Sequence, residues 1–327
     1  MMIMTIIFLM VGFALLVKGA NYFVDGSAAL AKNFRVNPLI IGLTIVACGT
    51  SAPELAVSLS AAAEGSSEIA LSNNIGSNTF NLLGILGICA VMSPIIVEKT
   101  IIKRDFAVTT ISTVLLFVGL AGFTIVGKIP AMGDIVTKNV ARISGLGGAM
   151  LLGGYVMYII YIFMKTQGKE DEEYEGVKSI PNKKCVLYLI AGVIMIILGG
   201  KTVVTSAKAL ALMAGMSETL IGLTIVAIGT SLPELVTSVV ATRKGQIGIA
   251  LGNVLGSNIF NLLFILGISA IITPIYVNVA SVYDLFILLI VTIITWLFAF
   301  TEHKLNKTEG VIMLVMYGFA MAYAIIR

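Results

Sequence analysis

The stretch IGLTIVACGTSAPEL at residues 41–55 returns almost unchanged as IGLTIVAIGTSLPEL at residues 221–235. Thirteen of the fifteen positions are identical, at an offset of 180 residues. Each copy places one carboxylate, Glu54 or Glu234, inside an otherwise apolar segment. Such a repeat predicts two copies of one structural unit, each contributing a glutamate.

The same offset continues downstream of the first repeat. SNNIGSNTFNLLGILGI (72–88) and GNVLGSNIFNLLFILGI (252–268) agree at twelve of seventeen positions. The duplicated unit is therefore longer than one motif, and its polar positions are duplicated together with its apolar ones.

Composition indicates a membrane protein. The chain is 58% hydrophobic and 12% charged, whereas a soluble domain carries roughly 25% charged residues. The charges avoid apolar runs of about 20 residues, the length that a helix needs to cross ~30 Å of hydrocarbon. The net charge of +4 is spread over short loops and does not indicate nucleic-acid binding. Cys48, Cys89 and Cys185 lack pairing or ligand spacing and are interpreted as small hydrophobic residues.

The apolar runs predict an all-α polytopic protein with ten transmembrane helices. Residues 1–17 lack a basic n-region and a small-residue cleavage site, so they predict a first transmembrane helix and not a signal peptide. The polar, mixed-charge residues 165–183 predict a flexible linker between the fifth and sixth spans. The predicted spans are residues 3–31, 38–62, 67–95, 102–125, 140–164, 184–212, 218–242, 246–275, 281–301 and 308–326.

Basic residues predict the orientation in the membrane. Fourteen of the 21 lysines and arginines fall in loops on one side, five on the other, and Lys18 and Lys201 lie within spans. The richer side is expected to face the cytoplasm. This places the 165–184 linker inside and both termini outside, in the plasma (inner) membrane.

Five spans in each unit have a structural consequence. The first unit (1–164, with its motif in spans two and three) starts outside, and the second (184–327, with its motif in spans seven and eight) starts inside. The two homologous units are thus predicted to be inverted five-helix repeats, an arrangement that many secondary transporters use for alternating access.

The repeated motifs carry the chemistry. Gly49 and Pro53 are expected to interrupt a predicted helix and to leave backbone carbonyls without their helical hydrogen bonds. In lipid these carbonyls need another partner, and a cation can serve as one. Thr50 and Ser51 lie four and three residues before Glu54 and share its helix face. The corresponding set is Thr230, Ser231 and Glu234, and the next spans add Ser77 with Asn81 and Ser257 with Asn261, each pair four residues apart.

Every candidate ligand is an oxygen atom, and the only histidine, His303, lies in a predicted loop. An all-oxygen site with two carboxylates suits Ca²⁺ or Na⁺ and serves zinc or copper poorly. One Ca²⁺, two Na⁺ or two protons would neutralise the glutamates, which are costly when bare at the bilayer midplane. A site that crosses the membrane only when filled predicts an exchanger.

The motifs GTSAPE (49–54) with GSNTFN (76–81), and GTSLPE (229–234) with GSNIFN (256–261), resemble the α-repeats of the calcium/cation antiporter superfamily. The nearest branch is that of the prokaryotic sodium/calcium exchangers, and the resemblance extends over all ten spans. It implies eight core helices around the motifs, with the long first and sixth helices sliding across them.

The resemblance also implies roles for individual residues. Glu54 and Glu234 would bridge Ca²⁺, with electrogenic exchange against Na⁺. Asn261 stands where some relatives carry an aspartate and matches Asn81, so a third carboxylate is absent. The remaining implied ligands are the backbone oxygens of Thr50 and Thr230 for Ca²⁺, and for Na⁺ the carbonyls of Ala47 and Ala227 with Ser51, Ser77, Ser231 and Ser257.

The leading hypothesis is Na⁺/Ca²⁺ antiport that normally exports Ca²⁺. H⁺/Ca²⁺ antiport is the nearest alternative, K⁺-dependent exchange is another, and a cation channel is the alternative from a different class. An enzyme is not expected, because the chain has no HExxH motif, Ser-His pairing or aspartyl dyad. The expected partners are Ca²⁺, Na⁺ (with H⁺ or K⁺ as alternatives) and the lipid bilayer, with no cofactor, no nucleic acid and no obligatory protein partner.

Overall fold

A computed structural model describes the chain except for residues 1, 66, 127–138, 166–176, 216–226 and 327. Among the described residues, six helices are long and apolar enough to cross a membrane, and a bent pair, Pro38–Thr50 with Ala52–Ala63, would make a seventh. The chain is therefore an all-helical membrane protein. Much of the predicted linker and the start of the seventh predicted span lie outside the described residues.

The helical elements follow the predicted spans closely. Among the described residues, four short segments are π-helical and carry the label η, and each continues directly into a neighbouring α-helix. The helices are α1 (Met2–Phe34), α2 (Pro38–Ile41), η1 (Gly42–Val46), α3 (Ala47–Thr50), α4 (Ala52–Ala63), α5 (Ser67–Thr79), η2 (Phe80–Ile85), α6 (Leu86–Met92), α7 (Lys99–Ile101), η3 (Ile102–Phe106), α8 (Ala107–Val126), α9 (Gly145–Lys165), α10 (Asn182–Met213), α12 (Ala227–Gly229), α13 (Leu232–Arg243), α14 (Ile247–Ile259), η7 (Phe260–Ile265), α15 (Leu266–Ile272), α16 (Val279–Glu302) and α17 (Lys307–Ile326).

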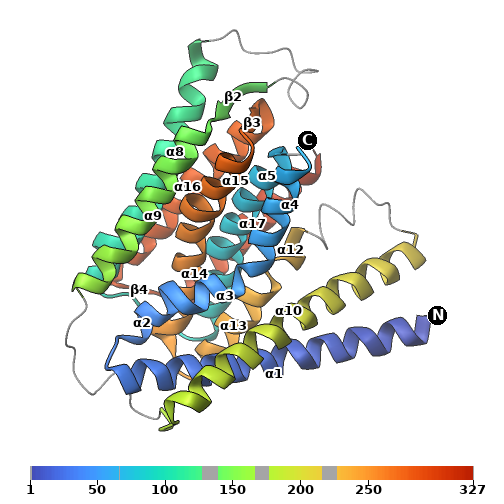
Figure 1. Cartoon of the computed structure of the whole chain (residues 1–327), viewed down its shortest axis with the longest axis vertical. Helices are drawn as coiled ribbons and strands as arrows, with labels where there is room; N and C mark the ends of the chain where they lie inside the picture. The colour runs from blue at the N-terminus through green and yellow to red at the C-terminus, as the bar shows by residue number, and fades with distance from the viewer. Residues whose placement is uncertain (1, 66, 127–138, 166–176, 216–226, 327) are drawn as a thin grey trace.

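The two longest helices, α1 and α10, lie side by side and run at an angle to the other helices (Figure 1). They are antiparallel and approach each other backbone to backbone. A Cβ atom on Gly19 would lie 2.9 Å from the carbonyl oxygen of Gly192, and one on Gly192 would lie 2.9 Å from that of Gly19. Contacts this short require glycine on both helices, so the pair forms one closely packed unit.

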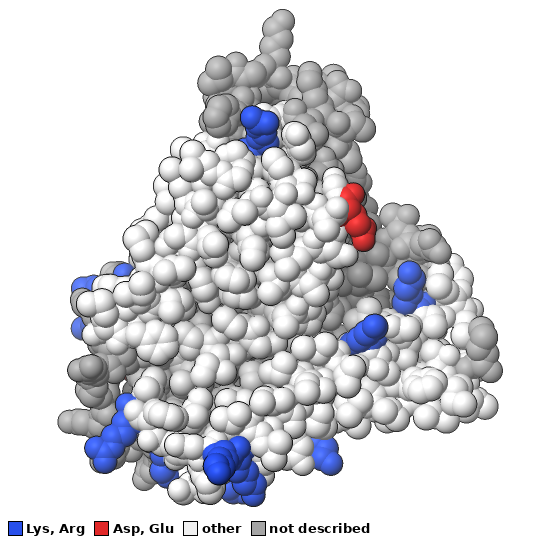
Figure 2. Space-filling view, viewed as in Figure 1, with Lys and Arg blue, Asp and Glu red and all other residues white. Residues whose placement is uncertain are grey.

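The remaining helices form a bundle in which α8 packs on α16, α9 on α15 and α17 on α6. Much of its interior is apolar: Leu82 and Leu262, which correspond in the two repeats, are both fully buried. The outer surface is apolar as well, with Met164 77% exposed and Phe319 73% exposed. A broad uncharged surface, with Lys and Arg mainly along the lower margin, is visible in Figure 2 and is what a lipid environment requires.

Four short strands were not predicted. β1 (Ile95–Ile96) pairs with β4 (Lys304–Leu305), and β2 (Asn139–Ile143) pairs with β3 (Ile275–Asn278), both antiparallel. The predicted span 140–164 is therefore wrong at its start, because those residues hydrogen-bond to β3 and the helix begins only at Gly145. Each pair joins a segment of the first half of the chain to a segment of the second half.

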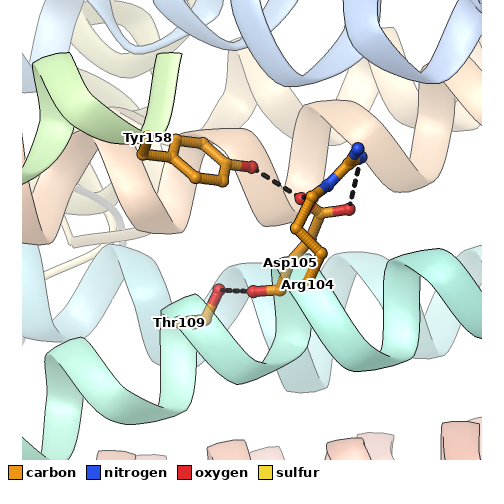
Figure 3. A network of polar contacts seen from close by, with 4 residues as sticks. All are labelled: Arg104, Asp105, Thr109 and Tyr158. Carbon is orange, nitrogen blue, oxygen red and sulfur yellow. Dashed lines mark hydrogen bonds and ion pairs between the residues drawn. The ribbon is translucent and has the colours of Figure 1, made fainter. Parts of the chain in front are cut away.

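A buried polar cluster connects η3 and the start of α8 to α9 through hydrogen bonds (Figure 3). Arg104 donates from Nε and Nη2 to the two carboxylate oxygens of Asp105 at 2.8 and 2.9 Å. Tyr158 of α9 donates its hydroxyl to Asp105 Oδ1 at 2.8 Å, and Thr109 donates to the Asp105 backbone carbonyl at 2.8 Å. The Asp105 side chain is fully buried, and both of its oxygens are paired.

Candidate cation site

The predicted helix interruption is present at the first motif. α3 ends at Thr50, α4 begins at Ala52, and the two helices are bent by 49°. Ser51 sits at the bend with φ −80° and ψ 10°. Pro53 has no N–H, so the carbonyl of Gly49 receives no regular helical hydrogen bond. The bend thus turns the Ser51 side chain and the first turn of α4, which contains Glu54, toward the interior of the bundle.

The described part of the second motif has the same interruption. α12 ends at Gly229, α13 begins at Leu232, and Ser231 between them has φ −91° and ψ 7°. Glu234 lies in the first turn of α13, as Glu54 lies in that of α4. The two motifs, identical at thirteen of fifteen positions, therefore share this helix interruption.

The two motifs exchange hydrogen bonds. Ser51 donates to Glu234 Oε1 at 2.7 Å, and Ser231 donates to Glu54 Oε1 at 3.0 Å. Each glutamate thus accepts a hydrogen bond from Ser51 or Ser231 of the other motif and not from the corresponding serine of its own motif. The site belongs to both repeats at once, as the pairing of the motifs predicts.

The predicted serines of the following spans complete this arrangement. Ser257 Oγ lies 3.0 Å from Ser51 Oγ, and Ser77 Oγ lies 3.0 Å from Ser231 Oγ. Ser77 also approaches Glu54 Oε1 at 3.5 Å. All four hydroxyls are within 1% of complete burial, so they line the glutamate pair away from solvent.

The glutamates themselves are incompletely paired. Glu54 and Glu234 are each 1% exposed and lie close enough for their charges to interact. Within the described part of the chain, Oε2 of each has no hydrogen-bond partner, and no lysine, arginine or histidine forms an ion pair with either. A buried carboxylate without a counter-charge costs several kcal/mol, so this pair requires a positive ligand or proton.

Asn81 and Asn261 lie in π-helical turns, η2 and η7, at matching positions of the two repeats. Single π-turns within α-helices are frequent at functional sites because they re-aim a side chain. Each side chain donates its amide nitrogen to another asparagine, whereas each Oδ1 lacks a partner among the described residues. Two neutral oxygen acceptors are therefore left over in the buried interior.

The predicted threonines are less alike than the other pairs. Thr50 is fully buried and donates to Asn253 Oδ1 at 2.9 Å, whereas Thr230 is partly buried and lies 3.5 Å from Asn73 Oδ1. The carbonyl of Ala47 accepts from Ser51 N and Thr50 Oγ1, so it must release a bond to take a cation. Ala227 begins α12, but its side chain lies outside the described residues.

Several polar residues around the site were missed. Asn253 donates to Ser238 at 2.9 Å and to the carbonyl of Glu234 at 3.3 Å. In the first repeat Asn74, which corresponds to Val254, donates to Ser58 at 3.0 Å.

Asn78 and Asn258, which are fully buried, contact each other across the two repeats. The offset of 180 residues could have singled out Asn78 with Asn258, because they lie in the repeated GSN sequence.

In the described part of the chain, no group of three or more Asp, Glu, His or Cys residues could hold a metal ion. The candidate site is instead two buried carboxylates surrounded by hydroxyl and amide oxygens, in the middle of an all-helical membrane bundle. Fold and site together define a membrane transporter of cations.

Sequence comparison identifies the family. The family model "Sodium/calcium exchanger protein" matches residues 4–164 and 184–326, which is nearly the whole chain. The chain belongs to this family, which is a family of transporters and not of enzymes.

Relatives and solved structures agree with this assignment. The chain is 36% identical to the putative antiporter CaxA of Alkalimonas amylolytica, with 97% of each chain covered. It is 32% identical to the sodium/calcium exchanger MaX1 of Methanosarcina acetivorans, again with 97% of each covered. A structure of the sodium-calcium exchanger NCX_Mj soaked without Na⁺ and Ca²⁺ superposes with a TM-score of 0.82 at 29% identity and covers 99% of both chains. A second structure of NCX_Mj, soaked with Na⁺ and Sr²⁺, gives a TM-score of 0.81 at 30% identity and covers 98% of this chain and 99% of that one.

Proposed function

We propose that the protein is an electrogenic antiporter that exchanges Na⁺ for Ca²⁺ by alternating access and normally exports Ca²⁺. The observation that carries the proposal is the pair of buried glutamates, Glu54 and Glu234, each with one carboxylate oxygen left without a partner in the described chain. One Ca²⁺ placed between them would neutralise both and bind the free oxygens. The relatives named as sodium/calcium exchangers support the choice of ions.

The surrounding oxygens suit both ions. Ser51, Ser77, Ser231 and Ser257 offer hydroxyl oxygens at the edge of the glutamate pair, and the amide oxygens of Asn81 and Asn261 are unused. Na⁺ and Ca²⁺ are hard cations that take several such ligands. A Ca²⁺ load leaves the two-carboxylate site neutral, and any Na⁺ load of more than two charges leaves it positive, so the exchange moves net charge. The proposed ligand set is that of the sequence: Glu54, Glu234, Thr50, Thr230, Ser51, Ser231, Ser77, Ser257, Asn81, Asn261, Ala47 and Ala227.

An inverted repeat provides the route for alternating access. The proposed units are residues 1–164 and 184–327, joined by the 165–183 linker. Three observations support them: the family model matches two blocks, 4–164 and 184–326, the π-turns η2 and η7 differ by 180 residues, and the serine–glutamate bonds are exchanged between units. The α1–α10 pair, packed as one unit against the motif helices, is the proposed moving part.

The proposed orientation has the linker in the cytoplasm and both termini outside the plasma membrane. Loops assigned to the cytoplasmic side contact one another: Lys32 donates to the carbonyl of Val177, and β1 pairs with β4. Loops assigned to the outside also pair, as β2 with β3. In a cysteine-free background, a membrane-impermeant maleimide should label Glu64→Cys but not Lys178→Cys in intact cells. The opposite labelling pattern would contradict this orientation.

Transport is tested with purified protein in liposomes. With Na⁺ inside and Na⁺-free buffer outside, we expect rapid uptake of radioactive Ca²⁺ that a matched choline gradient does not drive. A negative-outside diffusion potential should speed the uptake, because charge leaves with Na⁺. Uptake that ignores the Na⁺ gradient would refute Na⁺ coupling.

The same preparation separates the alternatives. H⁺/Ca²⁺ antiport is the second candidate, since two buried glutamates can also carry protons, and it would show uptake driven by a pH gradient alone. K⁺-dependent exchange would need K⁺ on the Ca²⁺ side. A cation channel would pass current with Ca²⁺ on one side and no exchanging ion on the other.

A further inference from the structure

Four buried asparagines join the two repeats next to the proposed ligands. Asn78 donates its amide nitrogen to the backbone carbonyl of Asn258 at 3.2 Å, and Asn258 returns the same bond to the carbonyl of Asn78 at 3.4 Å. Asn81 donates to Asn258 Oδ1 and Asn261 donates to Asn78 Oδ1, both at 3.0 Å. We call these four residues the asparagine quartet; none is more than 1% exposed.

The chemistry of the backbone fixes how every amide of the quartet points. A carbonyl oxygen only accepts hydrogen bonds, so the side-chain nitrogen of Asn258 must face the carbonyl of Asn78. Its Oδ1 then faces Asn81, which can meet an oxygen only with its own amide nitrogen. The Oδ1 of Asn81 is consequently the atom left over, and it has no partner among the described residues. The same steps through Asn78 leave Oδ1 of Asn261 free.

We propose that Asn78 and Asn258 are positioning residues, which hold Asn81 and Asn261 so that each presents an oxygen and never an N–H group to the transported cation. This inference rests on the proposed function, because Asn81 and Asn261 act as ligands in it. It extends the machinery by two residues that touch no cation themselves. It also places the positioning group of each ligand on the opposite repeat, as the serines are placed for the glutamates.

The first test is Asn258→Ala, which removes both the donor to Asn78 and the acceptor for Asn81. Asn81 is then free to turn its N–H group toward the cation. A lost or reversed ligand of this strength should raise the half-saturating Ca²⁺ concentration roughly tenfold to a hundredfold. The maximal rate per folded molecule should change much less. Asn78→Ala should behave like Asn258→Ala by the symmetry of the quartet.

The second test asks whether Asn258 acts through Asn81. In an Asn81→Ala background, adding Asn258→Ala should raise the half-saturating concentration by less than about threefold, because the positioned group is already gone. Fully additive effects would overturn the proposal. Thr292→Val is the matched control, since this buried hydroxyl binds only its own helix, at the carbonyl of Leu288. It should keep wild-type half-saturation.

The readouts separate two failures. Half-saturation is measured by Ca²⁺-dependent thermal stabilisation of purified protein and, independently, by uptake into liposomes. If the wild type shows neither Ca²⁺ binding nor uptake, the proposed function fails. If the wild type shows both and Asn258→Ala keeps its half-saturation, with only a lower melting temperature, the quartet is structural packing and the positioning role is refuted.

Discussion

The bundle contains two groups of buried carboxylates, and they differ in how completely their oxygens are paired. Asp105 is fully buried, and its two oxygens are matched by the guanidinium of Arg104 and the hydroxyl of Tyr158 (Figure 3). Glu54 and Glu234 are buried just as deeply, yet each has one oxygen without a partner in the described chain. Both regions use short, direct hydrogen bonds, so the difference is not one of packing quality.

The contrast separates a structural charge from the pair of carboxylates proposed to bind the transported cation. Asp105 carries its counter-ion on the adjacent residue of the same chain, so its pairing is permanent. The glutamates are held in place by neutral serines that supply orientation but no charge. A site that must release its cation on either side of a membrane cannot include a fixed counter-charge. Burial alone would have grouped the three carboxylates together, whereas the completeness of their pairing distinguishes them.

The largest expected effect is on transport by Glu54→Gln or Glu234→Gln. Either change halves the negative charge available to Ca²⁺ and should lower Ca²⁺ transport by at least roughly a thousandfold, the equivalent of about 4 kcal/mol. The protein should still insert, and its melting temperature without Ca²⁺ should stay equal or rise, because one uncompensated buried charge is removed. The rise in melting temperature on adding Ca²⁺ should vanish. Measurable Ca²⁺ exchange in either variant would refute the assigned site.

Asp105→Asn should give the opposite pattern. It leaves the largely buried guanidinium of Arg104 without its partner and should cost about 3 kcal/mol, seen as a drop in melting temperature of several degrees. Stabilisation by Ca²⁺ and the half-saturating Ca²⁺ concentration should be retained. Tyr158→Phe, which removes only the hydroxyl bond to Asp105, is the graded control and should cost about half as much. Loss of Ca²⁺ response with normal stability would reverse the comparison.

The smallest effect is expected at an exposed ion pair. Lys244, at the end of α13, lies 2.7 Å from Asp25 of α1, and their side chains are 29% and 42% exposed. Lys244→Met should lower stability by less than about 1 kcal/mol. The ion pair joins α1 to the motif helix α13, so its loss can affect the transport rate. Because salt screens exposed charges, Lys244→Met should change that rate by about twofold or less, and only at low ionic strength. A tenfold change in the transport rate that persists in high salt would show that this exposed pair matters as much as the buried carboxylates.

Periodic and compositional signals predicted the helical segments well. Long apolar runs such as α1 and α10 lie within a few residues of the predicted spans, because lipid forces every backbone group into a helix. The strands were missed because β1 and β4 are two residues long and pair across more than 200 residues of sequence. Runs this short carry no readable alternation. Most of strand β2 (Asn139–Ile143) was absorbed into the predicted span 140–164 because Val140 and Ile143 look equally apolar in a helix or a strand.

At the site, the repeat located the glutamates and serines but not how they pair. Sequence spacing placed Ser51 beside Glu54 of its own motif, whereas the structure gives it to Glu234. Only the arrangement of the two repeats in space decides this exchange. Asp105 was missed because it follows Arg104 at the start of a span and resembles an ordinary interfacial charge, and Tyr158, its third partner, is 53 residues away.

The exchange of hydrogen bonds between the repeats also affects how the protein is made. Glu54 receives its hydrogen bond from Ser231, which follows 177 residues later in the chain. At the usual pace of synthesis, that interval is roughly 9 to 35 s. During it the part of the chain already made resides in the bilayer with a carboxylate whose donor Ser231 has not yet been translated. The hydrogen bonding of Glu54 is therefore completed only when the second repeat has been made. A chain truncated before Ser231 would expose a buried carboxylate without this donor to the quality-control machinery of the membrane.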